Sequence, residues 1–262
     1  MTTEPDLVTS GVNLTALLGA VRQAGALIQQ IKTDGVSARY KADASPVTIA
    51  DEQANAVLVA ALSALYPGIA VISEEEAASH ALAPDGLFFL VDPLDGTREF
   101  IRADSQGAYT VNIGLIKSGQ AVGGIVYAPA LDWLCWGGPE TGARQIKDGR
   151  LSDLKIRSCP AGGPVAVASR SHLDAQTKQF LDRYEIDQMT SIGSSLKFLL
   201  LASGQADLYP RFGPTMEWDT AAGEAVLAGA GGAVFDEQGV PHGYGKPGWR
   251  NGAFIACADF AL

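Results

Sequence analysis

The sequence predicts a mixed α/β protein with an α+β N-terminal half. Three observations indicate this class. Two stretches near the N-terminus repeat apolar residues with a helical period, short apolar stretches bounded by Gly, Pro or Asp follow, and helical and strand-like stretches then alternate towards the C-terminus. Such alternation is typical of layered α/β domains. We expect two halves, 1–150 and 151–262, joined by a Gly- and Pro-rich zone around 137–164.

The N-terminal half is predicted to begin with two helices. Residues 14–31 place Leu, Val and Ile at helical spacing, and residues 48–65 form the second candidate helix. Thr48 is a suitable N-cap, and Asp51 in the first turn lies where the helix dipole favours negative charge. Pro67-Gly68 ends this helix.

The remaining predicted elements are short. In the first two thirds of the chain we expect strands over 69–73, 87–91, 109–116, 122–127, 131–136, 154–157 and 164–168. Further on, we expect helices over 172–184, 194–203 and 219–229, and strands over 206–209, 232–235 and 253–257.

The composition describes a globular domain with an acidic surface. Of the 262 residues, 47% are hydrophobic and 18% are charged, which provides enough apolar material for a large core. A net charge of −10 argues against nucleic acid and anionic membranes as partners. The chain shows no basic leader, no membrane-length apolar run and no C-x-x-C motif. We expect a cytoplasmic protein without an integral membrane segment, and peripheral attachment to the inner membrane stays open.

Carboxylates recur where predicted strands or extended segments meet turns or helix starts: Asp51 in SPVTIAD, Glu74 in VISEEEA, Asp92 and Asp95 in VDPLDGT, and Asp219 in EWDTAAGEA. Each has a purely structural explanation, such as a solvated loop for Glu74, a tight Asp-Pro-Leu-Asp turn, or an N-cap for Asp219. If these carboxylates converge, their repulsion requires a counter-charge. Hard cations such as Mg²⁺ take oxygen ligands of this kind.

Four ordered segments also carry recognisable motifs. VDPLDGTREF matches D-P-[IL]-D-G-T, EWDTAAGEAVLAGAGG matches W-D-x-A-A-G, ISEEE matches [GS]-E-E, and SPVTIAD matches V-T-x-x-D. Together they resemble the inositol monophosphatase-like, lithium-sensitive, Mg²⁺-dependent phosphatases. KADASPVT, VNIGLI, SIGSSLKF and LYPRFGPT are most similar to the CysQ-type 3′(2′),5′-bisphosphate nucleotidase branch of that family. The resemblance runs from about Leu14 to the C-terminus and implies a layered α-β-α-β-α sandwich with the metal site between the two halves.

The resemblance implies roles for individual residues. It assigns oxygen ligands for two or three Mg²⁺ ions to Glu74, Asp92, the Leu94 carbonyl, Asp95 and Asp219. Asp92 would bridge two ions, and Asp51 with Thr97 corresponds to the pair that orients and deprotonates the attacking water. We expect the Leu94 side chain to turn towards the core, and Gly96 to let the N–H groups of Gly96 and Thr97 approach a phosphate.

Basic residues are expected to select the substrate, because an anion needs a locally positive pocket in an acidic chain. The candidate contacts are Lys41, Arg170, Ser194, Ser195, Lys197 and Arg211, together with Glu74, Leu94, Asp95, Gly96, Thr97 and Asp219 of the metal site. His172 is read as a helix-start or substrate-contact residue, and His80 and His242 are read as loop residues. The chain departs from the family pattern at Ala108, where an acidic residue is expected.

The implied activity is Mg²⁺-dependent removal of the 3′-phosphate from adenosine 3′,5′-bisphosphate, with 3′-phosphoadenosine 5′-phosphosulfate as a further candidate substrate. One alternative is an inositol monophosphatase or sugar bisphosphatase with the same metal site and a different pocket wall. Another is a non-catalytic nucleotide sensor, which the loss of Asp51, Thr97 or a metal ligand would indicate; all are present. No G-x-S-x-G nucleophile motif occurs. The expected partner is a small-molecule bisphosphonucleotide, and a homodimer stays open.

Overall fold

Two helices cover one face of a seven-stranded sheet in the computed structural model, which describes residues 4, 6–40, 46–102, 107–168 and 174–259. The helices are α1 (Leu18–Asp34) and α2 (Ile49–Leu65). The strands, in sheet order, are β11 (Arg150–Leu154), β10 (Gly142–Lys147), β9 (Trp133–Gly138), β8 (Gln120–Ala128), β7 (Thr110–Lys117), β6 (Leu87–Asp95) and β5 (Ala70–Ser73). Only β5 and β6 are parallel neighbours; the other pairs are antiparallel.

The opposite face of this sheet is covered by α6 (Ala221–Gly229), which comes from the C-terminal half of the chain. The close approach depends on glycine, because a Cβ at Gly124 would collide with the backbone of Ala222. Apolar residues on both faces build hydrophobic clusters, among them one under α1 and α2 and another around α5 (Leu196–Ala202) and α6. The packing of α6 therefore holds its N-terminal end over the first sheet.

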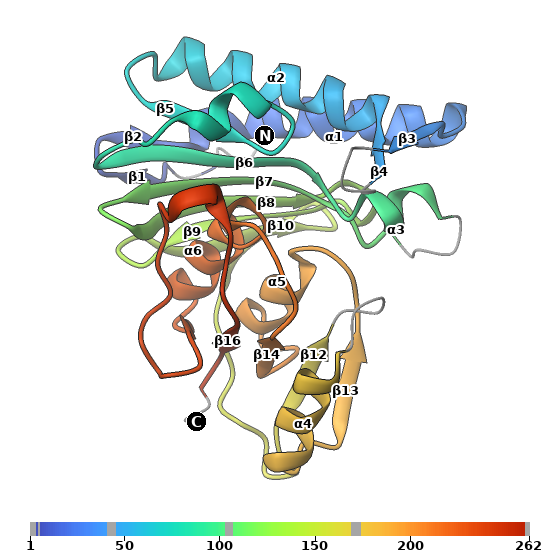
Figure 1. Cartoon of the computed structure of the whole chain (residues 1–262), viewed down its shortest axis with the longest axis vertical. Helices are drawn as coiled ribbons and strands as arrows, with labels where there is room; N and C mark the ends of the chain where they lie inside the picture. The colour runs from blue at the N-terminus through green and yellow to red at the C-terminus, as the bar shows by residue number, and fades with distance from the viewer. Residues whose placement is uncertain (1–3, 5, 41–45, 103–106, 169–173, 260–262) are drawn as a thin grey trace.

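A five-stranded sheet forms the next layer, and α4 (Ala175–Arg183) covers its outer face. Its strands, in sheet order, are β13 (Gln188–Ser191), β12 (Val165–Ala168), β14 (Leu208–Arg211), β16 (Phe254–Cys257) and β15 (Ala233–Phe235). Figure 1 shows the resulting α-β-α-β-α order from α1 and α2 at the top to α4 below. The predicted layered fold is confirmed.

The remaining elements are short. They are β1 (Val8–Thr9), β2 (Val12–Asn13), β3 (Ala38–Tyr40), β4 (Pro46–Thr48), α3 (Thr97–Ile101) and the single-turn helices η1 (Leu14–Leu17), η2 (Ala77–Ala81), η3 (Pro129–Leu131), η4 (Glu217–Asp219) and η5 (Pro247–Trp249). None of the helices in the described part of the chain has the length and apolar character that crossing a bilayer requires.

The zone around 137–164 is not mainly a linker. It contains the hairpin of β10 and β11, whose turn places Asp148 and Gly149 at positive φ of 51° and 69°. The strand expected over 154–157 is wrong in position, since β11 ends at Leu154. The Asp-Gly pair is a standard hairpin signal that could have located this turn. Division of the chain into halves at residue 150 stays a prediction.

Candidate active site

The acidic segment 92–95 is the end of a strand and not the tight turn that the sequence suggested. β6 continues to Asp95, and its pairing with β7 shifts register between Asp92 and Asp95. Along β6, Phe89 and Val91 belong to the core under α2. The irregularity changes this alternation, so Leu94 also enters that core. The expected burial of the Leu94 side chain is confirmed, at 2% exposure.

Three carboxylates converge at the end of β6. Ligand oxygens of Glu74, Asp92 and Asp219 all lie within 4.8 Å of one another. Burial and the repulsion from Glu74, Asp95 and Asp219 hold the pKa of Asp92 well above its ordinary value. Burial, Asp95 and Glu74 raise the pKa of Asp219 in the same way. Neutral carboxyls or a bound cation would relieve this repulsion.

The three residues reach this point from different elements. Glu74 directly follows β5, and its backbone N–H bonds the Val91 carbonyl at 3.0 Å. Asp92 lies in β6, with Leu94 N–H donating to its Oδ1 at 3.1 Å. Asp219 ends η4, and its Oδ2 accepts the Met216 N–H at 2.8 Å. Asp219 is therefore not the N-cap of α6, a position that Thr220 occupies.

This donor set fits Mg²⁺. All the candidate ligands offer oxygen, which this ion prefers, and a cation would relieve the repulsion that raises the pKa values of Asp92 and Asp219. The described residues thus form an acidic cluster that could bind metal. The roles of Asp95 and the Leu94 carbonyl as ligands stay predictions.

Asp95 is tied to the C-terminal half. Its Oδ2 accepts the Ser195 hydroxyl at 3.0 Å, and the same hydroxyl lies 3.0 Å from the Asp219 carbonyl. Burial raises the pKa of Asp95, while Lys197 and Ser195 act in the opposite direction. The Ser195 hydroxyl is thus engaged within the protein, and direct substrate contact by it stays a prediction.

Asp51 and Thr97 lie beside the acidic cluster. Thr48 caps α2 as predicted, and both its N–H and its hydroxyl donate to Asp51 Oδ2 at 2.7 Å. Asp51 Oδ1 accepts the Thr97 hydroxyl at 3.0 Å, and that hydroxyl also lies 3.2 Å from the Leu94 carbonyl. Burial raises the pKa of Asp51 despite these hydrogen bonds. A fixed carboxyl of raised pKa is suited to accepting a proton.

Gly96 allows the chain before Thr97 to pass close to the backbone of Ala108. It has a φ of 91°, in the left-handed region that favours glycine, and a Cβ there would lie 2.8 Å from the Ala108 carbonyl oxygen. Gly96 is also the N-cap of the short helix α3. A larger residue would displace this segment and the Thr97 hydroxyl with it.

A cavity of about 310 Å³ opens beside the cluster. Its wall combines Glu74, Asp92, Leu94, Asp95, Gly96, Thr97 and Asp219 with Ser194, Lys197 and Arg211 from the C-terminal half. Lys197 is 5% exposed, and its Nζ donates to the Ser194 carbonyl at 2.6 Å. Burial lowers the pKa of Lys197 to about 8, although Asp95 acts in the opposite direction. Four of the predicted acids, Glu74, Asp92, Asp95 and Asp219, therefore share one cavity with the predicted bases Lys197 and Arg211, whereas Asp51 does not line it.

The structure does not place the remaining predicted basic residues and the histidines in this cavity. Lys41, Arg170 and His172 lie outside the described residues. His242 is a loop residue as expected, but it is buried, with Nδ1 2.9 Å from Glu224. His80 lies in η2, where its ring stacks on Trp218 with centroids 4.9 Å apart.

Several further cavity residues lie within the motif segments but were not among the predicted contacts. They are Pro46, Glu99, Gly193, Phe198, Tyr209, Pro214, Thr215 and Thr220. The motifs located these segments in the sequence, but only the folded chain shows which of their side chains face the cavity.

Residues 12–257 match the inositol monophosphatase family. The chain belongs to the inositol monophosphatase family. The 3′(2′),5′-bisphosphate nucleotidase CysQ of Escherichia coli K12 is 46% identical over 226 residues, covering 85% of this chain and 90% of that protein. The nucleotidase CysQ of Aggregatibacter actinomycetemcomitans is 34% identical over 89% of this chain and 87% of its own.

Solved structures show the same architecture. The crystal structure of CysQ from Bacteroides thetaiotaomicron, a bacterial member of the inositol monophosphatase family, has a TM-score of 0.79 and 33% identity, covering 94% of this chain and 97% of its own. The extragenic suppressor protein SuhB from Bartonella henselae shares the fold at a TM-score of 0.75 and 23% identity, covering 94% of this chain and 93% of its own.

Proposed function

We propose that this protein is a 3′(2′),5′-bisphosphate nucleotidase that hydrolyses the 3′-phosphate of adenosine 3′,5′-bisphosphate to AMP and phosphate. The observation that carries the proposal is one cavity lined by the acidic cluster and by Lys197 and Arg211. A substrate with two phosphates suits such a cavity, because one phosphate can lie at the acidic cluster and the other near the cations. The 46% identity to a curated nucleotidase supports this choice.

Glu74, Asp92 and Asp219 would hold Mg²⁺, with Asp95 and the Leu94 carbonyl as further ligands. When bound, the cation supplies positive charge that stabilises the phosphoryl group during transfer and makes the attacking water more acidic. The ligand oxygens of Glu74, Asp92 and Asp219 lie within 4.8 Å of one another, so one ion could contact all three. Occupation by two or three ions, bridged by Asp92, is part of the proposal.

Asp51 and Thr97 are assigned to the proton of the attacking water. Water attacks phosphorus, the bond between phosphorus and the ribose 3′-oxygen breaks, and that oxygen leaves with the electron pair and takes up a proton. The Thr97 hydroxyl, 3.0 Å from Asp51 Oδ1, orients the water and passes its proton to the carboxylate. The two hydrogen bonds from Thr48 leave Oδ1 as the oxygen that faces Thr97.

Lys197 and Arg211 are assigned to the part of the substrate that does not react. The Lys197 ammonium lies 5.1 Å from the centre of the Tyr209 ring, which helps to hold it in place. Arg211 is fixed by hydrogen bonds to the Gly213 and Pro214 carbonyls, at 3.2 and 3.1 Å. Arginine can bond phosphate bidentately or stack on a base, so it suits either portion of a nucleotide.

A phosphate-release assay tests the proposal. Purified protein with Mg²⁺ is given adenosine 3′,5′-bisphosphate, inositol 1-phosphate, fructose 1,6-bisphosphate and 3′-phosphoadenosine 5′-phosphosulfate, and kcat/KM is compared. We expect adenosine 3′,5′-bisphosphate to be hydrolysed most efficiently. A higher kcat/KM for inositol 1-phosphate or fructose 1,6-bisphosphate would replace the nucleotidase assignment. Mg²⁺-dependent nucleotide binding without hydrolysis would indicate a sensor.

A further inference from the structure

The turn that carries Asp219 has little local support of its own. Residues 215–220 connect β14 to α6 and contain only the three-residue helix η4. Within the turn, Asp219 N–H bonds the Met216 carbonyl at 3.1 Å, and Met216 N–H bonds Asp219 Oδ2 at 2.8 Å. A single turn of this length is unstable alone. The position of the Asp219 carboxylate therefore depends directly on the position of Met216.

A second segment of the chain holds this turn. Asn251 is 5% exposed, and its backbone N–H bonds the Thr215 carbonyl at 2.9 Å. Its side-chain Nδ2 lies 2.8 Å from the Met216 carbonyl, 3.2 Å from the Thr215 hydroxyl and 3.1 Å from the Thr220 hydroxyl. One amide group thus contacts both ends of the turn. Its strongest contact is with Met216, which fixes one oxygen of Asp219.

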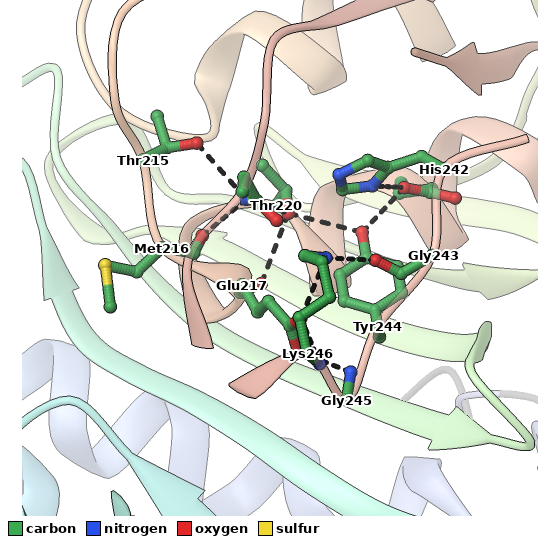
Figure 2. Close-up of polar contacts among 11 residues, drawn as sticks. Thr215, Met216, Glu217, Thr220, His242, Gly243, Tyr244, Gly245 and Lys246 are labelled. Carbon is green, nitrogen blue, oxygen red and sulfur yellow. Dashed lines mark hydrogen bonds and ion pairs between the residues drawn. The ribbon is translucent and has the colours of Figure 1, made fainter. Parts of the chain in front are cut away.

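Glu217 attaches the middle of the same turn to the same segment. Its carboxylate is fully buried, and the Gly245 and Lys246 N–H groups donate to it at 2.7 and 2.9 Å. The Lys246 ammonium lies 2.8 Å from Glu217 Oε1. Figure 2 shows these contacts between Glu217, Gly245 and Lys246, with Thr215, Met216 and Thr220 beside them.

From these contacts we propose that Asn251 is a positioning residue for the metal site, acting through Met216 on Asp219. The inference rests on the proposed function, in that Asp219 is taken as a Mg²⁺ ligand. Loss of the Asn251 amide leaves the Met216 carbonyl without this donor and lets the turn relax. The Met216 N–H then no longer holds Asp219 Oδ2 in its present direction. Glu217 keeps the turn attached to Gly245 and Lys246, so the fold survives while the ligand shifts.

The experiment compares Mg²⁺ binding by wild type, Asn251→Ala and Asn251→Leu, using calorimetry on the full chain. Leu has the same number and branching of side-chain heavy atoms as Asn but no donor, and Ala removes the same hydrogen bonds without adding bulk. Partners that orient metal ligands typically change metal affinity by about 10–100-fold when they are lost. We expect both variants to bind Mg²⁺ at least about tenfold more weakly, and excess Mg²⁺ to restore much of their kcat for adenosine 3′,5′-bisphosphate.

Arg157→Ala is the matched control. It breaks the ion pair between the partly exposed Arg157 and the buried Asp207, with NH2 2.6 Å from Oδ2. Asp207 directly precedes the strand whose far end bears Arg211. We expect this variant to lower Tm and leave the Kd for Mg²⁺ unchanged. If Asn251→Leu behaves like this control, with lower Tm and a Kd for Mg²⁺ within about twofold of wild type, the positioning role is refuted. If wild type itself binds no Mg²⁺, the proposed metal site falls first, so the two failures are distinguishable.

Discussion

Replacing Asp92 by Asn is expected to stabilise the metal-free protein while removing its activity. The substitution keeps the shape of the side chain, and the remaining oxygen can still accept the Leu94 N–H that now bonds Asp92 Oδ1 at 3.1 Å. It removes one of three carboxylate charges whose oxygens lie within 4.8 Å of one another. The buried cluster should therefore lose repulsion and keep its packing.

The magnitude follows from the geometry. Two unit charges 4.8 Å apart repel by about 3.5 kcal/mol at an effective dielectric constant of about 20, so Asp92 with two ionised neighbours would face about 7 kcal/mol. Proton uptake limits this cost, because protonating a carboxyl of ordinary pKa about 3.9 at pH 7.5 costs about 5 kcal/mol. If the amide NH₂ of the introduced Asn is buried without a hydrogen-bond partner, it lowers the stability of the variant by about 1–3 kcal/mol. We expect a net gain of about 2 kcal/mol, or about 4–8 °C in Tm.

Thermal unfolding in EDTA measures the effect. The folded-state pKa of Asp92 is raised, so its contribution to stability is present at low pH and is lost as pH rises through the folded pKa. The Asn variant should accordingly exceed wild type in Tm at pH 7.5, and the difference should shrink towards pH 4. Exposed Asp85→Asn is the control and should show no such pH-dependent gain. Added Mg²⁺ should raise the Tm of wild type more than that of the variant.

Two results would refute this reasoning. An Asn variant that is less stable than wild type in EDTA at pH 7.5 would mean that repulsion does not dominate the cluster. Near-normal turnover at saturating Mg²⁺ would remove Asp92 from the metal site altogether. We also expect Asp92→Asn to lower kcat more than Asp219→Asn does, because Asp92 is the residue proposed to serve two ions.

Three further predictions concern the neighbouring residues. Asp51→Asn should lower kcat and leave Mg²⁺ and substrate binding largely intact in calorimetry; loss of Mg²⁺ binding would make Asp51 a ligand. Lys197→Ala should raise KM for adenosine 3′,5′-bisphosphate about tenfold or more, because it removes a contact of about 1.5–3 kcal/mol. The hydrolysis of inositol 1-phosphate should hardly change. An equal loss of activity with both substrates would contradict a role in nucleotide recognition. The pKa of Lys197 is lowered to about 8, so its charge is present below that pH and lost above it. The KM of wild type for the bisphosphate should therefore rise above pH 8. If Lys197→Ala shows the same pH profile of KM as wild type, this explanation is wrong.

Local signals in the sequence predicted much of the fold. Thr48 caps the N-terminus of α2, as the sequence predicted, and α2 ends before Pro67-Gly68. The strand at 87–91 was also expected, but its extension through Asp95 was not, because a bulge depends on pairing with β7. Proline at position 93 favours a turn in isolation, and tertiary pairing overrides that preference.

Residues that act through distant contacts could not be predicted in this way. Asn251 lies 32 positions from Asp219 in the chain and belongs to no recognised motif, yet its amide contacts the Met216 carbonyl at 2.8 Å. His80 similarly has no local signature for its stacking on Trp218. The motifs give residue types and spacing along the chain, whereas these contacts arise only when two segments fold together.

The repulsion within the acidic cluster explains why residues distant in the sequence hold its carboxylates in place. In the absence of a cation, the carboxylates of Glu74, Asp92 and Asp219 repel one another. Each side chain must therefore be held in place by contacts with the rest of the protein. Asp92 is held by the strand ladder of β6. Asp219 lies in the turn before α6, and α6 itself packs closely against Gly124 of the sheet. The remaining freedom is in the 215–220 turn, where Asn251 and Glu217 make their hydrogen bonds. Metal affinity should therefore be sensitive to substitutions in that turn and its partners, and overall stability should be sensitive to the packing of α6.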